Sequence, residues 1–146
     1  MSSVADARRL QTAFIGIVRA LGLLRPDTTP CGQPMSISEA HALGELHRGG
    51  PVSQQALADA LRLQKSTVSR LVDQLERQGL VTRSTNPADR RSVILELTPT
   101  GTARAGQLGA ARRDLFQRLL AGLTPDERRT VFNGLTTLEE AAHALR

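Results

Sequence analysis

The residues whose types most clearly suggest binding chemistry lie between positions 62 and 91. That segment contains seven basic and three acidic residues, whereas residues 1–61 are neutral overall and residues 92–146 carry one net positive charge. Its first polar side chains are Gln64, Lys65, Ser66, Thr67, Ser69 and Arg70. Short hydroxyls allow a backbone to approach a major groove closely, and hydroxyl, amide and cationic groups bond to base edges and phosphates. A solvated basic face is the alternative interpretation, in which Ser66 and Ser69 cap a helix or face solvent.

A second cationic group lies at Asp89-Arg90-Arg91. A guanidinium fits a narrow, electronegative minor groove, and a neighbouring carboxylate can hold it in place. Asp89 can equally be a turn-forming residue, because Asp side chains accept hydrogen bonds from the backbone two residues on. We also expect Arg83 to contact DNA. Together with the polar segment, these residues predict a surface for duplex nucleic acid.

Composition argues against several other classes of function. The chain has three Phe and no Trp or Tyr, which argues against aromatic platforms that stack single-stranded bases. The one cysteine, Cys31, excludes an internal disulfide framework, and no Cys/His cluster has zinc-ligand spacing. We recognise no activated nucleophile, glycine-rich phosphate loop or paired carboxylate. We therefore expect a protein that is not an enzyme and that holds no cofactor and no metal.

The N-terminal element follows from hydrophobic spacing. Apolar residues recur at alternating steps of four and three at Leu10, Phe14, Ile17, Leu21 and Leu24. This spacing predicts one long helix over residues 4–25 with a seam that packs against another helix. Three prolines and a glycine in residues 26–34 then predict a linker loop.

Three helices are expected in the centre of the chain. Ser36 and Glu39 have the spacing of a capping box, which begins a helix that ends near Arg48. A short helix begins after residues 51–53 and ends near residue 62. The third covers residues 65–78 and carries an apolar stripe opposite its polar side chains.

A hairpin and two more helices complete the expected order. Strand-like runs at residues 80–83 and 92–97 flank a polar loop over residues 84–91. Thr98-Pro99 then begins a helix that runs to about residue 120. The last helix starts at a capping box, Thr124 to Glu127, and its apolar positions are Val131, Leu135, Leu138, Ala142 and Leu145.

The central region resembles the MarR (multiple antibiotic resistance regulator) family. The resemblance covers about residues 52–101 and lies in five groups of residues: Leu57-Ala58-Asp59-Ala60-Leu61, Lys65-Ser66-Thr67-Val68-Ser69-Arg70-Leu71-Val72, Leu75-Glu76-Arg77-Gln78-Gly79-Leu80-Val81-Thr82-Arg83, Asp89-Arg90-Arg91-Ser92, and Leu97-Thr98 with Gly101. These groups occur in the family's order, and the flanking helices match its layout.

The resemblance implies a mainly α protein with a small β-hairpin wing, an α+β winged helix-turn-helix flanked by dimerisation helices. Residues 1–34 would be an N-terminal dimerisation helix and linker, residues 35–101 the DNA-binding domain, and residues 102–146 the C-terminal dimerisation helices. A homodimer would bind a palindromic operator, with half-sites about 10 base pairs apart.

The family's functional residues carry over position by position. Ser66, Thr67, Ser69 and Arg70 match its recognition-helix positions, and Arg91 matches the wing arginine that enters the minor groove. The resemblance makes Asp89 the acid that orients that arginine. It also implies a small-molecule effector between the dimerisation helices and the winged domain, where Phe14, Ile15, Val18, Met35 and His41 could line the site. Apolar residues at helical spacing are, however, far more often core residues than ligand contacts.

The sequence therefore predicts a ligand-responsive, DNA-binding transcriptional repressor. A winged-helix module that binds protein is one alternative, and a regulator that senses oxidants through Cys31 or a metal through His41 is another. No apolar run approaches the ~20 residues of a membrane span, and no signal-peptide pattern is present. We accordingly expect a bacterial protein of the cytoplasm that associates with the nucleoid.

Overall fold

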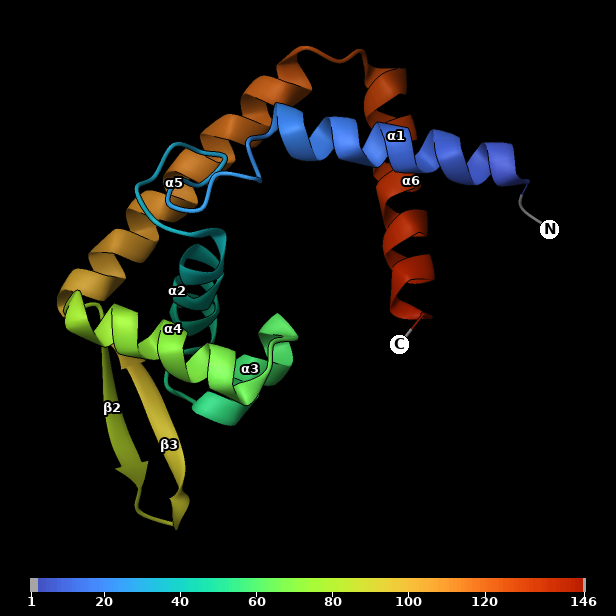
Figure 1. The fold of residues 1–146 in the computed structure, drawn as a ribbon. Coiled ribbons are helices and arrows are strands. Elements are labelled where there is room, and N and C mark those ends of the chain that lie inside the picture. The colour runs from blue at the N-terminus through green and yellow to red at the C-terminus, as the bar shows by residue number, and fades with distance from the viewer. Residues whose placement is uncertain (1–2, 146) are drawn as a thin grey trace. The chain divides into compact units, whose positions relative to one another are not determined.

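The computed structural model describes residues 3–145, which form six helices and three strands over that range (Figure 1). In chain order these are α1 (Val4–Ala20), α2 (Ile37–Gly49), β1 (Val52–Ser53), α3 (Gln54–Leu61), α4 (Lys65–Arg77), β2 (Val81–Asn86), β3 (Asp89–Leu97), α5 (Pro99–Ala121) and α6 (Pro125–His143). The mainly helical α+β fold with a hairpin agrees with the sequence prediction.

Side-chain caps begin the helices at the predicted places. The Ser36 hydroxyl accepts the Glu39 N–H at 3.1 Å, and the Glu39 carboxylate accepts the Ser36 N–H at 2.8 Å. The same reciprocal pair joins Thr124 and Glu127 at the start of α6. Each box satisfies N–H groups that have no partner inside the helix, so these starts are set by local sequence.

The first helix is shorter than predicted. It ends at Ala20, five residues before the expected end at Arg25. Gly22 adopts a φ of +71°, in the left-handed region that a glycine enters without steric cost. The apolar spacing continued through this stretch and concealed the end of the helix.

The core of the winged region lies between α2, α3, α4 and the sheet. Its fully buried side chains include Leu43 of α2, Leu57 of α3, Leu75 of α4 and Leu95 of β3. Burying a leucine side chain contributes about 1.5–3 kcal/mol. The core therefore holds one face of α4 inward and leaves the opposite face for other contacts.

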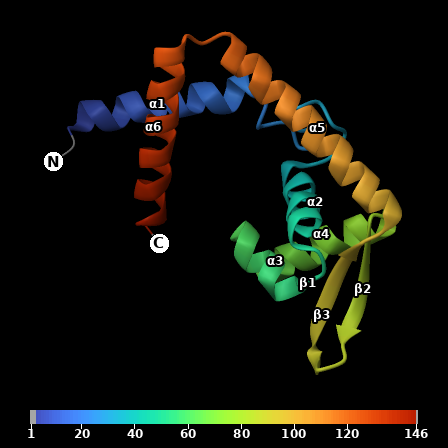
Figure 2. The ribbon, with the colours of Figure 1, turned by 180° about the vertical axis from the view of Figure 1, so that it is seen from behind.

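The sheet has three strands in the order β1-β3-β2, all antiparallel. β1 was not expected from the sequence; it is two residues long and pairs Val52 with Leu95 of β3, beside β3 in the view from behind (Figure 2). The predicted loop over residues 84–91 is also wrong, because most of it continues the strands to Asn86 and from Asp89. The hairpin β2–β3 is thus longer, and its turn much tighter, than the polar composition suggested.

A close backbone approach joins the start of α5 to the end of α4. The Thr98 N–H donates to the Leu80 carbonyl at 3.0 Å, and the Thr98 hydroxyl donates to the Gly79 carbonyl at 2.6 Å. The same hydroxyl accepts the Gly101 N–H at 2.9 Å, as an N-cap does. Gly101 is buried, and a Cβ there would lie 1.9 Å from the Leu80 oxygen.

The chain divides into two compact units, the first ending at Arg112 and the second beginning at Arg113. In the second unit the Arg128 guanidinium donates to the carbonyls of Leu120 and Leu123, which closes the turn before α6. The domain boundaries predicted from sequence remain a prediction. Over the described part of the chain, no helix combines the length and apolarity that crossing a membrane requires.

Candidate nucleic-acid interface

Helix α4 has two chemically different faces. Val68, Val72 and Leu75 are fully buried and anchor it in the core. Lys65, Ser66 and Arg70 are exposed, and Thr67 and Ser69 are half-buried. The N-cap residue, Gln64, is exposed and makes no side-chain cap bond. The structure therefore gathers the predicted polar residues on the outer face of one helix.

The hairpin carries a second group of exposed residues. Asp89, Arg90 and Arg91 are all exposed on β3. The Asp89 carboxylate accepts the backbone N–H of Arg91 at 3.0 Å. This is the turn-forming contact that we left open as an alternative, and the role of Asp89 in orienting the Arg91 side chain stays a prediction. In the structure Asp89 stabilises the backbone that presents Arg91.

Arg83, which we predicted to contact DNA, has partners inside the protein, and its contact with DNA stays a prediction. Its guanidinium forms ion pairs with Asp73 and, at 3.8 Å, with Glu76, both on α4. It also donates to the Ser69 carbonyl at 2.9 Å and to the Gln54 side chain at 3.4 Å. Arg83 therefore ties β2 to α4 and α3. An arginine whose acidic partner lies ten residues earlier in the chain, on another element, has no short-range signature, so spacing could not show this role.

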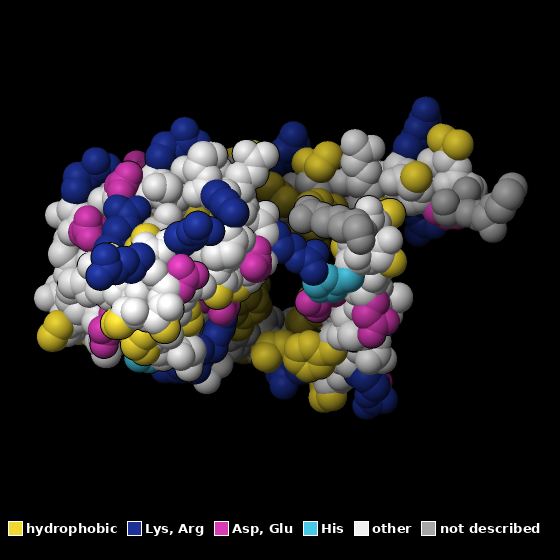
Figure 3. Space-filling model, turned by 90° about the horizontal axis from the view of Figure 1, so that it is seen from below, with side chains coloured by type: hydrophobic (Ala, Val, Ile, Leu, Met, Phe, Trp, Pro, Cys, Tyr) yellow, Lys and Arg dark blue, Asp and Glu magenta, His cyan; other side chains and the backbone are white. Residues whose placement is uncertain are grey.

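Among the cations predicted to bind DNA, Lys65, Arg70, Arg90 and Arg91 form no ion pair with another residue of the described range 3–145. We call them the unpaired cations. Seen from the hairpin end, Lys and Arg side chains recur over the first unit with Asp and Glu side chains between them (Figure 3). Cations without internal partners are the ones available to neutralise an external anion.

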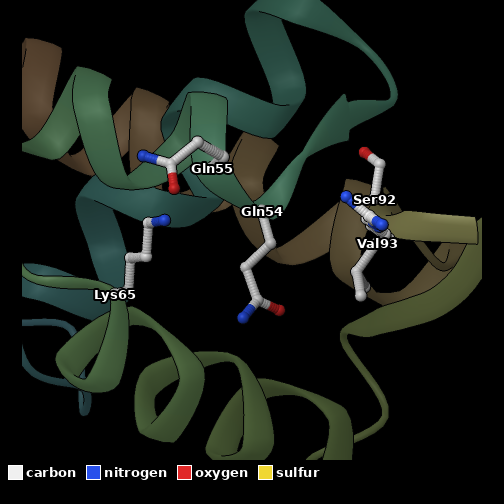
Figure 4. Close-up of a pocket in the computed structure, with 6 residues that line it drawn as sticks. Gln54, Gln55, Lys65, Ser92 and Val93 are labelled. Carbon is white, nitrogen blue, oxygen red and sulfur yellow. The ribbon is translucent and has the colours of Figure 1, made fainter. Parts of the chain in front are cut away.

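A cavity of about 200 Å³ lies where α3, α4 and β3 meet (Figure 4). It is lined by Gln54, Gln55, Lys65, Arg91, Ser92 and Val93. In the close-up the Gln54 side chain points from α3 toward α4, with Gln55 and Lys65 to one side and Ser92 and Val93 to the other. The sequence prediction missed Gln54 and Gln55. Their signal was the N-cap at Ser53, which places both amides in the first turn of α3.

The five residues predicted to line an effector crevice occupy different environments. Met35 is buried in the core, Val18 is half-buried, and Phe14, Ile15 and His41 are exposed. The pKa of His41 lies below its ordinary value because desolvation disfavours the charged ring and Arg112 and Arg48 repel it. The effector site stays a prediction.

The residues proposed for alternative sensing functions have ordinary local partners. The Cys31 sulfur is half-buried and lies 3.1 Å from the Thr29 hydroxyl. Within the described range, no three His, Cys, Asp or Glu side chains converge as metal ligands. Glu45, one helical turn from His41, pairs with Arg48.

Comparison with known proteins places these features in a family. The family model that matches is that of the MarR family, over residues 35–93. A putative transcriptional regulatory protein for the hcr operon of Thauera aromatica is 37% identical over 87 residues, which cover 60% of this chain and 52% of that relative. The uncharacterised HTH-type transcriptional regulator YfiV of Bacillus subtilis is 31% identical over 107 residues, covering 73% and 67%. The match to the first of these relatives thus spans about half of its length.

Solved structures share the fold over almost the whole chain. FabT of Streptococcus pneumoniae, crystallised in complex with DNA, superposes with a TM-score of 0.83 at 23% identity, covering 97% of this chain and 100% of that one. PcaV of Streptomyces coelicolor, crystallised with its natural ligand, has a TM-score of 0.67 at 25% identity, covering 97% and 99%. Sequence, family model and fold agree, and the chain belongs to the MarR family of HTH-type transcriptional regulators.

Proposed function

We propose that this protein binds a specific duplex DNA sequence as a homodimer and represses transcription from it. In this proposal α4 enters the major groove and the hairpin β2–β3 reaches the adjacent minor groove. The observation that carries the proposal is the exposed polar face of α4 beside a hairpin whose two arginines have no ion pair with another residue between 3 and 145.

The chemistry of the α4 face suits the reading of base edges. Arg70 is exposed and forms no ion pair with the described part of the chain, and a guanidinium in the major groove donates two hydrogen bonds to guanine O6 and N7. Ser66 and Thr67 add short hydroxyls that bond to bases or phosphates without holding the backbone away. Buried Val68 and Val72 make the helix a rigid support for these groups.

The hairpin supplies long cationic side chains. Arg90 and Arg91 are exposed on β3, next to a turn in which the Asn86 side-chain oxygen Oδ1 accepts the Ala88 N–H at 3.0 Å. Arginine is favoured in narrow minor grooves, where the negative potential is strongest. A short, hydrogen-bonded turn presents the two guanidiniums with little loss of backbone entropy.

A second copy of this chain is the occupant that we propose for the exposed apolar residues of the terminal helices. Leu10, Phe14 and Ile17 of α1 are 48–54% exposed, and Phe132 and Leu135 of α6 are 54% and 55% exposed. Both sets recur at the spacing of a helix seam, which pairs with another helix. A dimer of winged domains would then match a palindromic operator, with half-sites about 10 base pairs apart.

Sedimentation analysis tests the dimer. The wild-type protein is expected to sediment as a dimer at micromolar concentration, and Phe132→Glu, which puts a charge into the seam, as a monomer. Asn133→Glu on the same helix turn is the control and should stay dimeric. A wild-type monomer that binds DNA tightly would refute the dimer.

We further propose that a small-molecule effector releases the protein from DNA. Support comes from PcaV, which was crystallised with its natural ligand and shares the fold. The test is thermal-shift screening of small aromatic acids, followed by measurement of operator affinity with each stabilising compound. A compound that stabilises the protein without lowering operator affinity would not be an effector.

Selection of genomic fragments followed by anisotropy titration tests the DNA function. The expected result is one recovered palindrome whose affinity falls steeply with salt, because each neutralised phosphate releases counterions with a log–log slope of about −0.9. A winged-helix module that binds protein would recover no fragment and show no such dependence.

A further inference from the structure

We propose that the cavity between α3, α4 and β3 holds one phosphate group of the DNA backbone. The inference rests on the proposed function and adds to it a specific anion site. The groups that would bind the phosphate are the Lys65 ammonium, the Arg91 guanidinium and the Gln54 amide, whose residues line one cavity from three different elements. In this arrangement Arg91 contacts the backbone beside the minor groove, and Arg90 is the arginine that enters the groove.

The lining of the cavity is rich in donors. Two of its six residues are cations, and both belong to the unpaired cations. None of the six is acidic. An oxyanion satisfies this arrangement, since Lys, Arg and an amide N–H each donate hydrogen bonds to it.

Arg83 fixes which end of the Gln54 amide is available. The Gln54 carbonyl oxygen accepts a hydrogen bond from the Arg83 guanidinium at 3.4 Å. The oxygen is therefore occupied, and the NH₂ group, with two donors, is the end left for a ligand. Arg83 is itself held by Asp73 and by the Ser69 carbonyl, so the amide has a rigid support.

The position of the cavity matches the path of a DNA strand. A major groove and the minor groove beside it are separated by one sugar–phosphate backbone. A protein with α4 in the first groove and its hairpin in the second must straddle that backbone. The cavity lies between the start of α4 and β3, where the straddled strand passes.

The size of the cavity favours a small group over a drug-sized effector. Its volume is about 200 Å³, whereas sites for drug-sized ligands have about 300–1,000 Å³. A water takes about 30 Å³ of liquid volume, so a phosphate and a few waters fill the space. Binding of one phosphate by a residue of α4 and a residue of β3 would fix the positions of the helix and the hairpin relative to the same DNA strand.

Methylphosphonate scanning of the operator tests the site. Each backbone position is replaced in turn by a neutral methylphosphonate, and affinity is measured for the wild type and for Lys65→Gln. We expect one position per half-site at which the replacement costs the wild type about 10-fold in affinity but Lys65→Gln less than about 2-fold, as for two groups that interact directly.

Arg77→Gln is the matched control, because it removes the same charge from the other end of α4, outside the cavity. At the coupled position it should lose about 10-fold, as the wild type does. Gln54→Leu should show a reduced loss, as Lys65→Gln does. Lys65 is exposed and has no ion pair within the described chain, so its replacement should leave the circular dichroism spectrum unchanged.

Three results would overturn the inference. If the wild type binds DNA but every methylphosphonate costs Lys65→Gln as much as it costs the wild type, the cavity holds no backbone phosphate and the proposed function survives. If the wild type binds no duplex, both fail. If millimolar inorganic phosphate at constant ionic strength competes with DNA in the wild type but not in Lys65→Gln, the cavity takes a free anion instead; we expect no such competition.

Discussion

The contact between Gly101 and Leu80 makes a quantitative prediction for Gly101→Ala. The new Cβ would lie 1.9 Å from the Leu80 carbonyl oxygen and 2.9 Å from its carbon. Both atoms belong to the backbone, so no side-chain rotation can relieve the overlap. The start of α5 must move away from the end of α4 by roughly an ångström, since Cβ contacts under 3.0 Å are essentially never observed.

The magnitude follows from opposing effects. Alanine favours a helix by up to about 1 kcal/mol over glycine. Overpacking costs about 1–3 kcal/mol, and the movement strains two Thr98 bonds, to the carbonyls of Leu80 and Gly79, worth about 1 kcal/mol each. The steric effect dominates, and we expect Gly101→Ala to lower the free energy of unfolding by about 2–3 kcal/mol. At about 2–4 °C per kcal/mol, the melting temperature should fall by about 4–12 °C.

Gly106→Ala is the control on the same helix. Gly106 is exposed, and a Cβ there would meet no atom within 4 Å. The same substitution should therefore raise the free energy of unfolding by up to about 1 kcal/mol. Thermal and urea unfolding followed by circular dichroism measure both variants. Equal stability of the two variants would refute the steric explanation of Gly101.

Three further predictions concern the interface and pH. Arg83→Ala should lower the free energy of unfolding by about 1–2 kcal/mol in urea titrations, because it removes a charged hydrogen bond to α4 that is partly screened by solvent. Unchanged stability would contradict the role of Arg83 in tying β2 to α4. Arg91→Ala should weaken binding to all duplexes, measured by anisotropy, and reduce the slope of log affinity against log salt by about 1. Arg70→Ala should in addition reduce the discrimination between the preferred base pair and the others by about 1–3 kcal/mol. If neither variant changes binding, both residues lie outside the interface. The pKa of His41 is lowered in the folded state, so the unfolded chain binds more protons near and below pH ~6.5, and the free energy of unfolding should fall as the pH drops through that region. In urea titrations at several pH values, His41→Gln should reduce this fall. An unaltered pH profile would exclude His41 as its source.

Local sequence determined where most elements begin and which faces they show. Ser36 with Glu39, and Thr124 with Glu127, set helix starts because each pair satisfies N–H groups only three residues away. The periodic apolar residues of α4 determined its buried face, and hence the outward direction of Ser66 and Arg70. Such features depend on neighbours within one or two turns, so a pattern along the chain carries them.

The tertiary structure alone decided which distant groups meet. Arg83 looked like a residue of the binding surface, but packing of β2 against α4 brings Asp73 and the Ser69 carbonyl within its reach. Gln54 becomes part of a cavity only because α3, α4 and β3 meet. Gly101 is explained by a carbonyl twenty-one residues earlier in the chain. The partner of a long polar side chain, or the space beside a glycine, depends on how separate elements pack. Hydrophobic periodicity indicates only that a face is buried; it does not indicate which element covers that face.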